Sequence, residues 1–289
     1  MLMEMFSKRF FNRLLLMMRY FMKEIKFNLK LILLRKEFYI FILFLLGLIF
    51  FNILFSFKEA SRISLYAETI SSPENLTLFG GSGFWILPVF IIGVPIFGSL
   101  AFCDLDFIEK RRRIDYNLSF RINRNKNRIM RMILIFLISF ILIFFSLMLD
   151  YFCLKIILGN GLRNTFFISD MPAFLYTTSS QAFGNLIYNN TSLYVLFLNL
   201  YPSLILALII TLCYAVSFYI NKKMVIYFIG PILLIISDFI GSNMNIKTLA
   251  ILENLQYNSF NIFNSFLQII FLFGVSILLI MNKREKDIC

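Results

Sequence analysis

Long apolar stretches separated by short polar segments dominate this sequence. About twenty helical residues rise about 30 Å, which is roughly the thickness of the hydrocarbon core of a bilayer. Six stretches of about this length carry almost no charge. They predict an all-α integral membrane protein with six transmembrane helices, at residues 38–57, 84–103, 132–158, 193–220, 224–240 and 260–281.

Two polar or helix-breaking features refine this pattern. Pro88 and Pro95 lie in the second stretch and predict a kink or a broken outer turn there. Lys222 and Lys223 separate the fourth and fifth stretches, and two lysines at bilayer depth would be costly. We therefore predict a tight turn at this point, with the flanking spans forming an antiparallel hairpin.

The distribution of positive charge predicts the orientation of the chain. If the N-terminus is inside, 23 of the 28 lysines and arginines fall on the cytoplasmic side. Cytoplasmic loops of membrane proteins carry such an excess. We predict a multi-pass protein of a plasma membrane, bacterial in type, with both termini cytoplasmic. The positive-inside pattern explains the net charge of +12, so we expect no nucleic-acid partner.

Composition removes several kinds of chemistry. Only 15% of the residues are charged, against about 25% in soluble domains. The absence of histidine excludes Ser-His and Cys-His catalysis as well as histidine-ligated metals. The four cysteines lie far apart and form no CxxC pair, so neither a zinc site nor a disulfide framework is expected. From this composition we predict no catalytic, cofactor or metal site. The N-terminus also lacks the pattern of a cleavable signal peptide.

The basic N-terminal segment, residues 1–37, has a helical periodicity. Basic residues recur every three or four positions, with apolar residues between them. This pattern predicts an amphipathic helix on the anionic inner leaflet of the membrane, and the alternative is a plain orientation signal. The basic positions are Arg19, Lys23, Lys26 and Lys30, and the apolar ones are Phe21, Met22, Ile25 and Leu29.

The loop between the second and third spans, residues 104–131, begins with acidic residues and continues with a basic run. A short apolar segment and a second basic run follow. This order predicts a short helix across the membrane face that docks on a soluble partner, and the alternative is an ordinary positive-inside loop. The apolar anchors would be Ile114, Leu118, Phe120 and Ile122.

In this loop the sequence resembles permease subunits of type-two ABC exporters. That family often carries an acidic residue, a Gly-Thr pair, the pattern Leu-Leu-Ser-x-Pro-x-Ser-Arg, and a lysine entering the third span. The segment Leu118-Ser119-Phe-Arg-Ile122-Asn-Arg124 is similar to the central part of this pattern. Glu109 is the nearest acidic residue, and Arg131 stands in the place of the lysine. The Gly-Thr pair is missing, and Arg121 replaces the proline.

The resemblance implies a function and a set of partners. In the family this loop is a coupling helix that fits a groove on a separate ATPase subunit. Two permeases, either two copies or a copy and a homologue, pair with two ATPases and export an amphipathic molecule. This chain has no GxxxxGK[ST] phosphate loop, so ATP would bind to the partner and the chain itself is not expected to be an enzyme. The coupling residues implied here are Glu109, Arg111, Arg112, Arg113, Leu118, Ser119, Ile122 and Arg124.

Two carboxylates lie near the outer ends of apolar stretches. Asp150 follows eighteen uncharged residues, and Asp238 lies fifteen residues beyond Lys223. We expect both to reach the outer surface or to cap helix ends. The alternative is a proton, cation or substrate site within the membrane. A membrane aspartyl protease would need both carboxylates deep and facing each other, which their positions do not favour.

Two other functions remain open at this point. A non-transporting membrane scaffold or assembly factor would use the same basic loop to bind a cytoplasmic partner. A secondary transporter would be driven by ions through Asp150 or Asp238, although the sequence has no visible inverted repeat.

Overall fold

The computed structural model describes residues 25–66, 77–78, 86–105, 124–158, 191–220, 222–244, 246, 248, 250–252 and 262–282. Within these ranges the regular structure is entirely helical, as the apolar pattern predicts. Residues 25–33 form a helix that breaks at residues 34–35. The longer helices that follow are α2 (Lys36–Tyr66), α4 (Leu87–Phe102), α7 (Arg124–Leu158), α11 (Thr191–Ser217), α12 (Lys223–Asn243) and α14 (Ile262–Asn282).

The helix boundaries follow the predicted spans closely, with three differences. The last three spans agree to within three residues at each end. Helix α2 runs on to Tyr66, beyond the predicted end at residue 57. Helix α7 begins at Arg124, so the last part of the predicted inner loop is helical. Helix α4 begins only at Leu87, with Pro88 in its first turn, where the missing N–H of proline costs no hydrogen bond.

Five of the described helices, α2, α7, α11, α12 and α14, are long and apolar enough to cross a membrane. Helix α4 has sixteen residues and therefore rises about 24 Å, less than the roughly 30 Å of the hydrocarbon core. For five of the six segments, the prediction of a helix long and apolar enough to span a membrane is thus confirmed.

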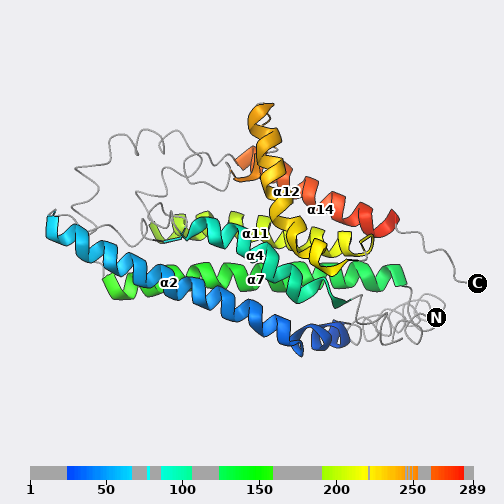
Figure 1. The fold of residues 1–289 in the computed structure, drawn as a ribbon, viewed down its shortest axis with the longest axis horizontal. Helices are drawn as coiled ribbons and strands as arrows, with labels where there is room; N and C mark the ends of the chain where they lie inside the picture. Colours follow the sequence, from blue (N-terminus) through cyan, green and yellow to red (C-terminus); the bar gives the residue numbers. More distant parts are fainter. Residues whose placement is uncertain are drawn as a thin grey trace, which may run out of the picture.

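Helix α11 occupies the centre of the bundle. Of the most apolar stretch of α11, 72% is buried inside the protein, whereas the corresponding share is 28–33% in the other four long helices. It packs on α4, α7, α12 and α14, while α2 covers α4 and α7 (Figure 1). A helix that is apolar on all sides suits this position, because every face meets another helix.

Helix α12 leaves the bundle at a steep angle to α11 (Figure 1). The two helices are joined by the short turn that the lysines predict, but they cross instead of running side by side as an antiparallel hairpin. Gly230 lies at the crossing point. A Cβ atom there would stand 2.7 Å from the Cβ of Pro95 and 3.3 Å from the Sγ of Cys213. The close approach of α12 to α4 and α11 therefore depends on the missing side chain.

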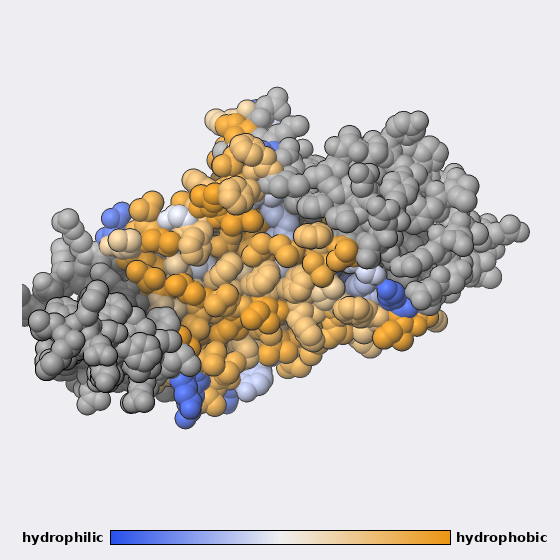
Figure 2. Space-filling view, turned by 180° about the vertical axis from the view of Figure 1, so that it is seen from behind, coloured by the Kyte–Doolittle hydropathy of each residue, from blue (hydrophilic) through white to orange (hydrophobic). Residues whose placement is uncertain are grey.

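The outer surface of the described helices is mostly apolar (Figure 2). Large side chains such as Leu43, Phe51, Phe145 and Phe239 are more than half exposed. Polar residues gather towards the edges of this surface in Figure 2. A soluble protein rarely shows an apolar surface of this extent, whereas lipid chains would cover it.

Candidate functional site

Segments that are distant in sequence meet at one end of the bundle, which we call the polar end. It comprises residues 25–35, the C-terminus of α4 with residues 103–105, the N-terminus of α7 and the N-terminus of α12 (Figure 1). The sequence assigns all of these segments to the same side of the membrane.

Asn28 fixes the helix of residues 25–33 to the first turns of α7. Its Nδ2 donates to the Oδ1 of Asn127 at 2.9 Å, and its Oδ1 accepts from the Nε of Arg131 at 2.8 Å. Asn28 and Arg131 are almost fully buried. The described part of the N-terminal segment is thus packed against the bundle through a polar contact, with Ile32 buried one turn further along.

Arg35 joins the break after this helix to the end of α4. Its Nη1 donates to the carbonyl oxygen of Ala101 at 2.9 Å. That carbonyl belongs to the last turn of α4, where the helix dipole and the unpaired carbonyls favour a cation. The Nε of Arg35 lies 3.4 Å from the Oε2 of Glu37. The Nη2, which is also buried, has no hydrogen-bond partner among the described residues.

Asp104 connects the end of α4 to the start of α12. Its Oδ2 accepts from the Nζ of Lys223 at 2.9 Å. The Lys223 side chain is 47% exposed, so solvent weakens this pair. The contact ties the first residue of the predicted inner loop to the turn between α11 and α12. Movement of that loop would therefore act directly on α12.

The polar end carries an excess of buried positive charge. Arg128, on α7, is 4% exposed, and its guanidinium carbon lies 4.8 Å from the centre of the Phe218 ring. A cation above an aromatic face is favourable, more so when both groups are desolvated. Arg35 and Arg131 are the other two arginines that are buried among the described residues. Together they give this end a positive potential that suits an acidic or anionic partner.

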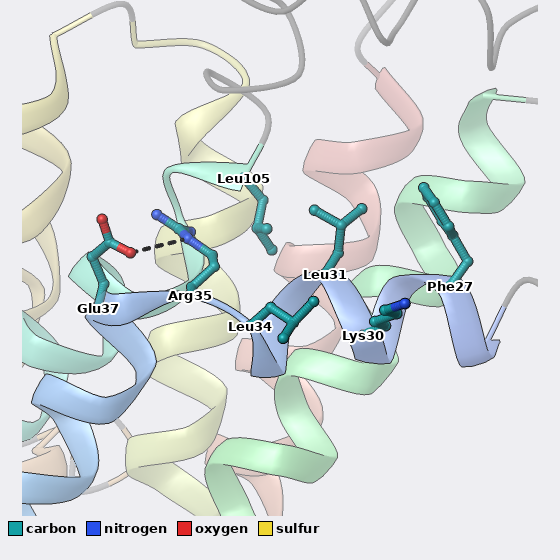
Figure 3. Close-up of a pocket in the computed structure, with 7 residues that line it drawn as sticks. All are labelled: Phe27, Lys30, Leu31, Leu34, Arg35, Glu37 and Leu105. Carbon is teal, nitrogen blue, oxygen red and sulfur yellow. Dashed lines mark ion pairs between the residues drawn. The ribbon is translucent and has the colours of Figure 1, made fainter.

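A groove opens beside Arg35, with a volume of about 540 Å³ (Figure 3). Residues from the helix of residues 25–33, from the break after it, from the first turn of α2 and from the segment after α4 line it. The lining residues are Phe27, Lys30, Leu31, Leu34, Arg35, Glu37 and Leu105.

Most residues of the predicted coupling helix lie outside the described part of the chain. These are Glu109, Arg111, Arg112, Arg113, Leu118, Ser119 and Ile122. Arg124 is described as the first residue of α7. Both described ends of the loop contact the rest of the polar end, through Asp104 and through Arg131.

Sequence reasoning did not identify Asn28, Arg35 or Asp104 as members of one site. A signal was present for Asn28, because it is a polar residue that lies on the same helical face as Ile25 and Ile32. Arg35 and Asp104 gave no such signal. They look like ordinary positive-inside and loop charges, and their partners are 66 and 119 residues away.

Asp150 is buried within the bundle, and the expectation that it reaches the outer surface or caps a helix end is wrong. It is 1% exposed and lies eight residues before the end of α7. The Nδ2 of Asn52, on α2, donates to both of its carboxylate oxygens at 2.9 Å. The backbone N–H of Leu78 donates to its Oδ2 at 3.1 Å. Because these donors come from distant segments, sequence spacing could not place them together.

Asp238 occupies a different setting. It is half-buried near the end of α12, and its backbone carbonyl accepts a hydrogen bond from the Ser242 hydroxyl. Asp150 and Asp238 show no contact with each other among the described interactions. A paired-carboxylate site is therefore not formed by these two residues in the described structure.

Comparisons with known proteins give no further guide to function. No protein-family model, curated protein or solved structure matches this chain. Among the described residues, no group of three or more Cys, Asp or Glu side chains could hold a metal ion.

Proposed function

We propose that the chain is the membrane-spanning permease subunit of an ATP-driven ABC exporter. In this proposal α4 completes a set of six spans, the polar end faces the cytoplasm, and residues 1–37 form an interfacial helix. The protein resides in a plasma membrane and pairs with a second permease. ATP is bound and hydrolysed by separate ATPase subunits, and the chain itself is not an enzyme.

The observation that carries the proposal is the junction at the polar end. The loop of residues 104–131 begins at Asp104, which contacts α12, and ends in α7 at Arg131, which contacts Asn28. The loop follows α4, contacts α12 and ends in α7. A partner that displaced the loop would therefore move these three helices together. Coupling of ATP hydrolysis to transport requires a segment that transmits movement of the ATPase to the membrane helices. The resemblance of residues 109–131 to the exporter motif supports the same function.

The first test is association with an ATPase. The chain is co-expressed with the ABC ATPase encoded beside its gene and purified through a tag on the permease. The expected result is a stable complex whose ATPase activity depends on the permease. If no such ATPase gene lies nearby and none co-purifies, a membrane scaffold becomes the better explanation.

The second test concerns the loop. Reversal of charge at Arg111, Arg112 and Arg113 should abolish the complex or uncouple ATP hydrolysis from export. A matched control reverses Lys283, Arg284 and Lys286, which changes the net charge by the same amount. Deletion of residues 115–123, which removes no residue of α7, should likewise abolish the complex or uncouple ATP hydrolysis from export. Normal export with either loop variant would contradict the coupling assignment.

Asp150 favours a second candidate function, an ion-coupled secondary transporter. It is a buried carboxylate whose described hydrogen bonds come from an amide and a backbone N–H, and no basic side chain of the described residues contacts it. A carboxylate in this setting could bind a proton or a cation during transport. Asp150→Asn would then abolish transport. Transport that persists in Asp150→Asn, and that stops when the ATPase is inactivated, would exclude this alternative.

A further inference from the structure

The groove beside Arg35 combines buried positive charge with apolar walls. Arg35 is 8% exposed, and its buried Nη2 has no hydrogen-bond partner in the part of the chain that the structure describes. Lys30 is exposed on the same groove and forms no ion pair within the described part of the chain. Glu37 supplies the single negative charge among the lining residues. The groove therefore carries a net positive charge, and an anion held near the buried guanidinium group would offset part of its desolvation.

The depth of the groove corresponds to the headgroup region of a membrane. Arg35, Lys36 and Glu37 are the last charged residues before the uncharged stretch of residues 38–57. The water–hydrocarbon boundary therefore falls at this point of the chain, where basic side chains meet lipid phosphates. The break at residues 34–35 turns the chain from the helix of residues 25–33 into α2 at the same level.

The surface beside the groove suits an acyl chain. Leu34 and Leu43 are 69% and 67% exposed, and Tyr39 between them is 56% exposed. These residues continue from the groove along the outer face of α2. Phe27 and Leu31 add apolar lining next to Lys30, from the neighbouring helix (Figure 3). A phosphate bound by Lys30, beside Arg35, would thus have an apolar path for its lipid tail.

We propose that this groove binds the headgroup of one anionic phospholipid. The phosphate pairs with the exposed Lys30 in the positive field of the buried Arg35, and its acyl chains lie along Leu34 and the outer face of α2. The bound lipid would hold together the helix of residues 25–33, the end of α4 and the start of α2. The inference rests on the membrane embedding in the proposed function, but it does not depend on an ATPase.

The test measures lipid binding to the purified full-length chain in detergent micelles, without any ATPase. Phosphatidylglycerol and phosphatidylcholine with identical acyl chains are titrated, and bound lipid is counted by native mass spectrometry. We expect phosphatidylglycerol to bind more tightly. Lys30→Gln should weaken its binding about fivefold, which corresponds to the loss of one basic residue near an anionic surface. Glu37→Gln should strengthen it, because the carboxylate that competes for Arg35 is removed.

Two controls separate this site from a general charge effect. Lys222→Gln removes an exposed lysine at the same end but outside the groove, and it should leave phosphatidylglycerol binding unchanged. Inorganic phosphate at the same concentrations should not compete, because it has no acyl chain. Equal binding of the two lipids, equal effects of Lys30→Gln and Lys222→Gln, or full competition by phosphate would each overturn the proposal. None of these results bears on ATP coupling, so the two proposals can fail separately.

Discussion

At the scale of single residues, the contact between Asn52 and Asp150 has the clearest energetic consequence. Both residues are buried at 0–1% exposure, and one amide group serves both oxygens of the carboxylate. A buried carboxylate that loses its donors keeps its desolvation cost without compensation. The pair therefore links α2 to α7 more strongly than a surface contact would.

Asn52→Ala should lower the free energy of unfolding by about 2–3 kcal/mol, since it removes charge-assisted hydrogen bonds in a buried site. Ser139→Ala is the matched control. Ser139 is also buried, but its hydroxyl bonds only to carbonyl oxygens of its own helix, at 2.6 and 3.1 Å. That substitution should cost less than about 1 kcal/mol. Denaturant unfolding in detergent micelles measures both values, and equal losses would show that Asn52 does not stabilise the interface.

At the scale of the helices, the crossing of α12 over α4 and α11 depends on Gly230. Gly230→Ala should destabilise the protein by about 1–3 kcal/mol, because the new methyl group would press on the rigid ring of Pro95. Gly274→Ala in α14 is the control, since no atom lies within 4 Å of a Cβ there. It should be neutral or stabilise by up to about 1 kcal/mol, through the better helix propensity of alanine. Thermal unfolding followed by circular dichroism should give shifts of opposite sign, and a loss in both variants would contradict this explanation.

The packing of the helix of residues 25–33 depends on Asn28. Asn28→Leu keeps a side chain of similar size but removes the bonds to Asn127 and Arg131. Local opening of residues 25–33 should become easier, and their amide hydrogen exchange should accelerate about tenfold. Lys26→Gln changes an exposed residue of the same helix and should leave the exchange rates unchanged. Unaltered exchange in the Asn28 variant would mean that apolar contacts alone hold this helix.

At the scale of the whole molecule, the arrangement of helix ends predicts the topology. A variant without the four natural cysteines is labelled with a membrane-impermeant thiol reagent in intact cells. Lys222→Cys should be labelled only after the membrane is opened, and Ser82→Cys should be labelled from outside. Because α4, α7 and α11 lie between the two positions, their comparison tests whether α4 crosses the membrane despite its sixteen residues. Labelling of both positions from the same side would remove α4 from the set of spans.

The sequence alone was enough to predict the helical class, the positions of five helices that are long and apolar enough to cross a membrane, and the separation of basic segments from apolar ones. These properties depend on the local balance between apolar side chains and charges, which can be read along a single stretch of chain. The glycines show the limit of this approach. Gly230 and Gly274 look alike in the sequence, yet only Gly230 lies at a helix crossing.

Only the tertiary structure decided the burial of Asp150, the steep angle of α12, and the meeting of Asn28, Arg35 and Asp104 at one end. In each case the decisive partner lies far along the chain: Asn52 is 98 residues from Asp150, and Ala101 is 66 residues from Arg35. A polar side chain gives the same local pattern whether it meets water or a donor from another helix. Its environment is fixed only when the helices pack, because packing determines which groups lose their contact with solvent.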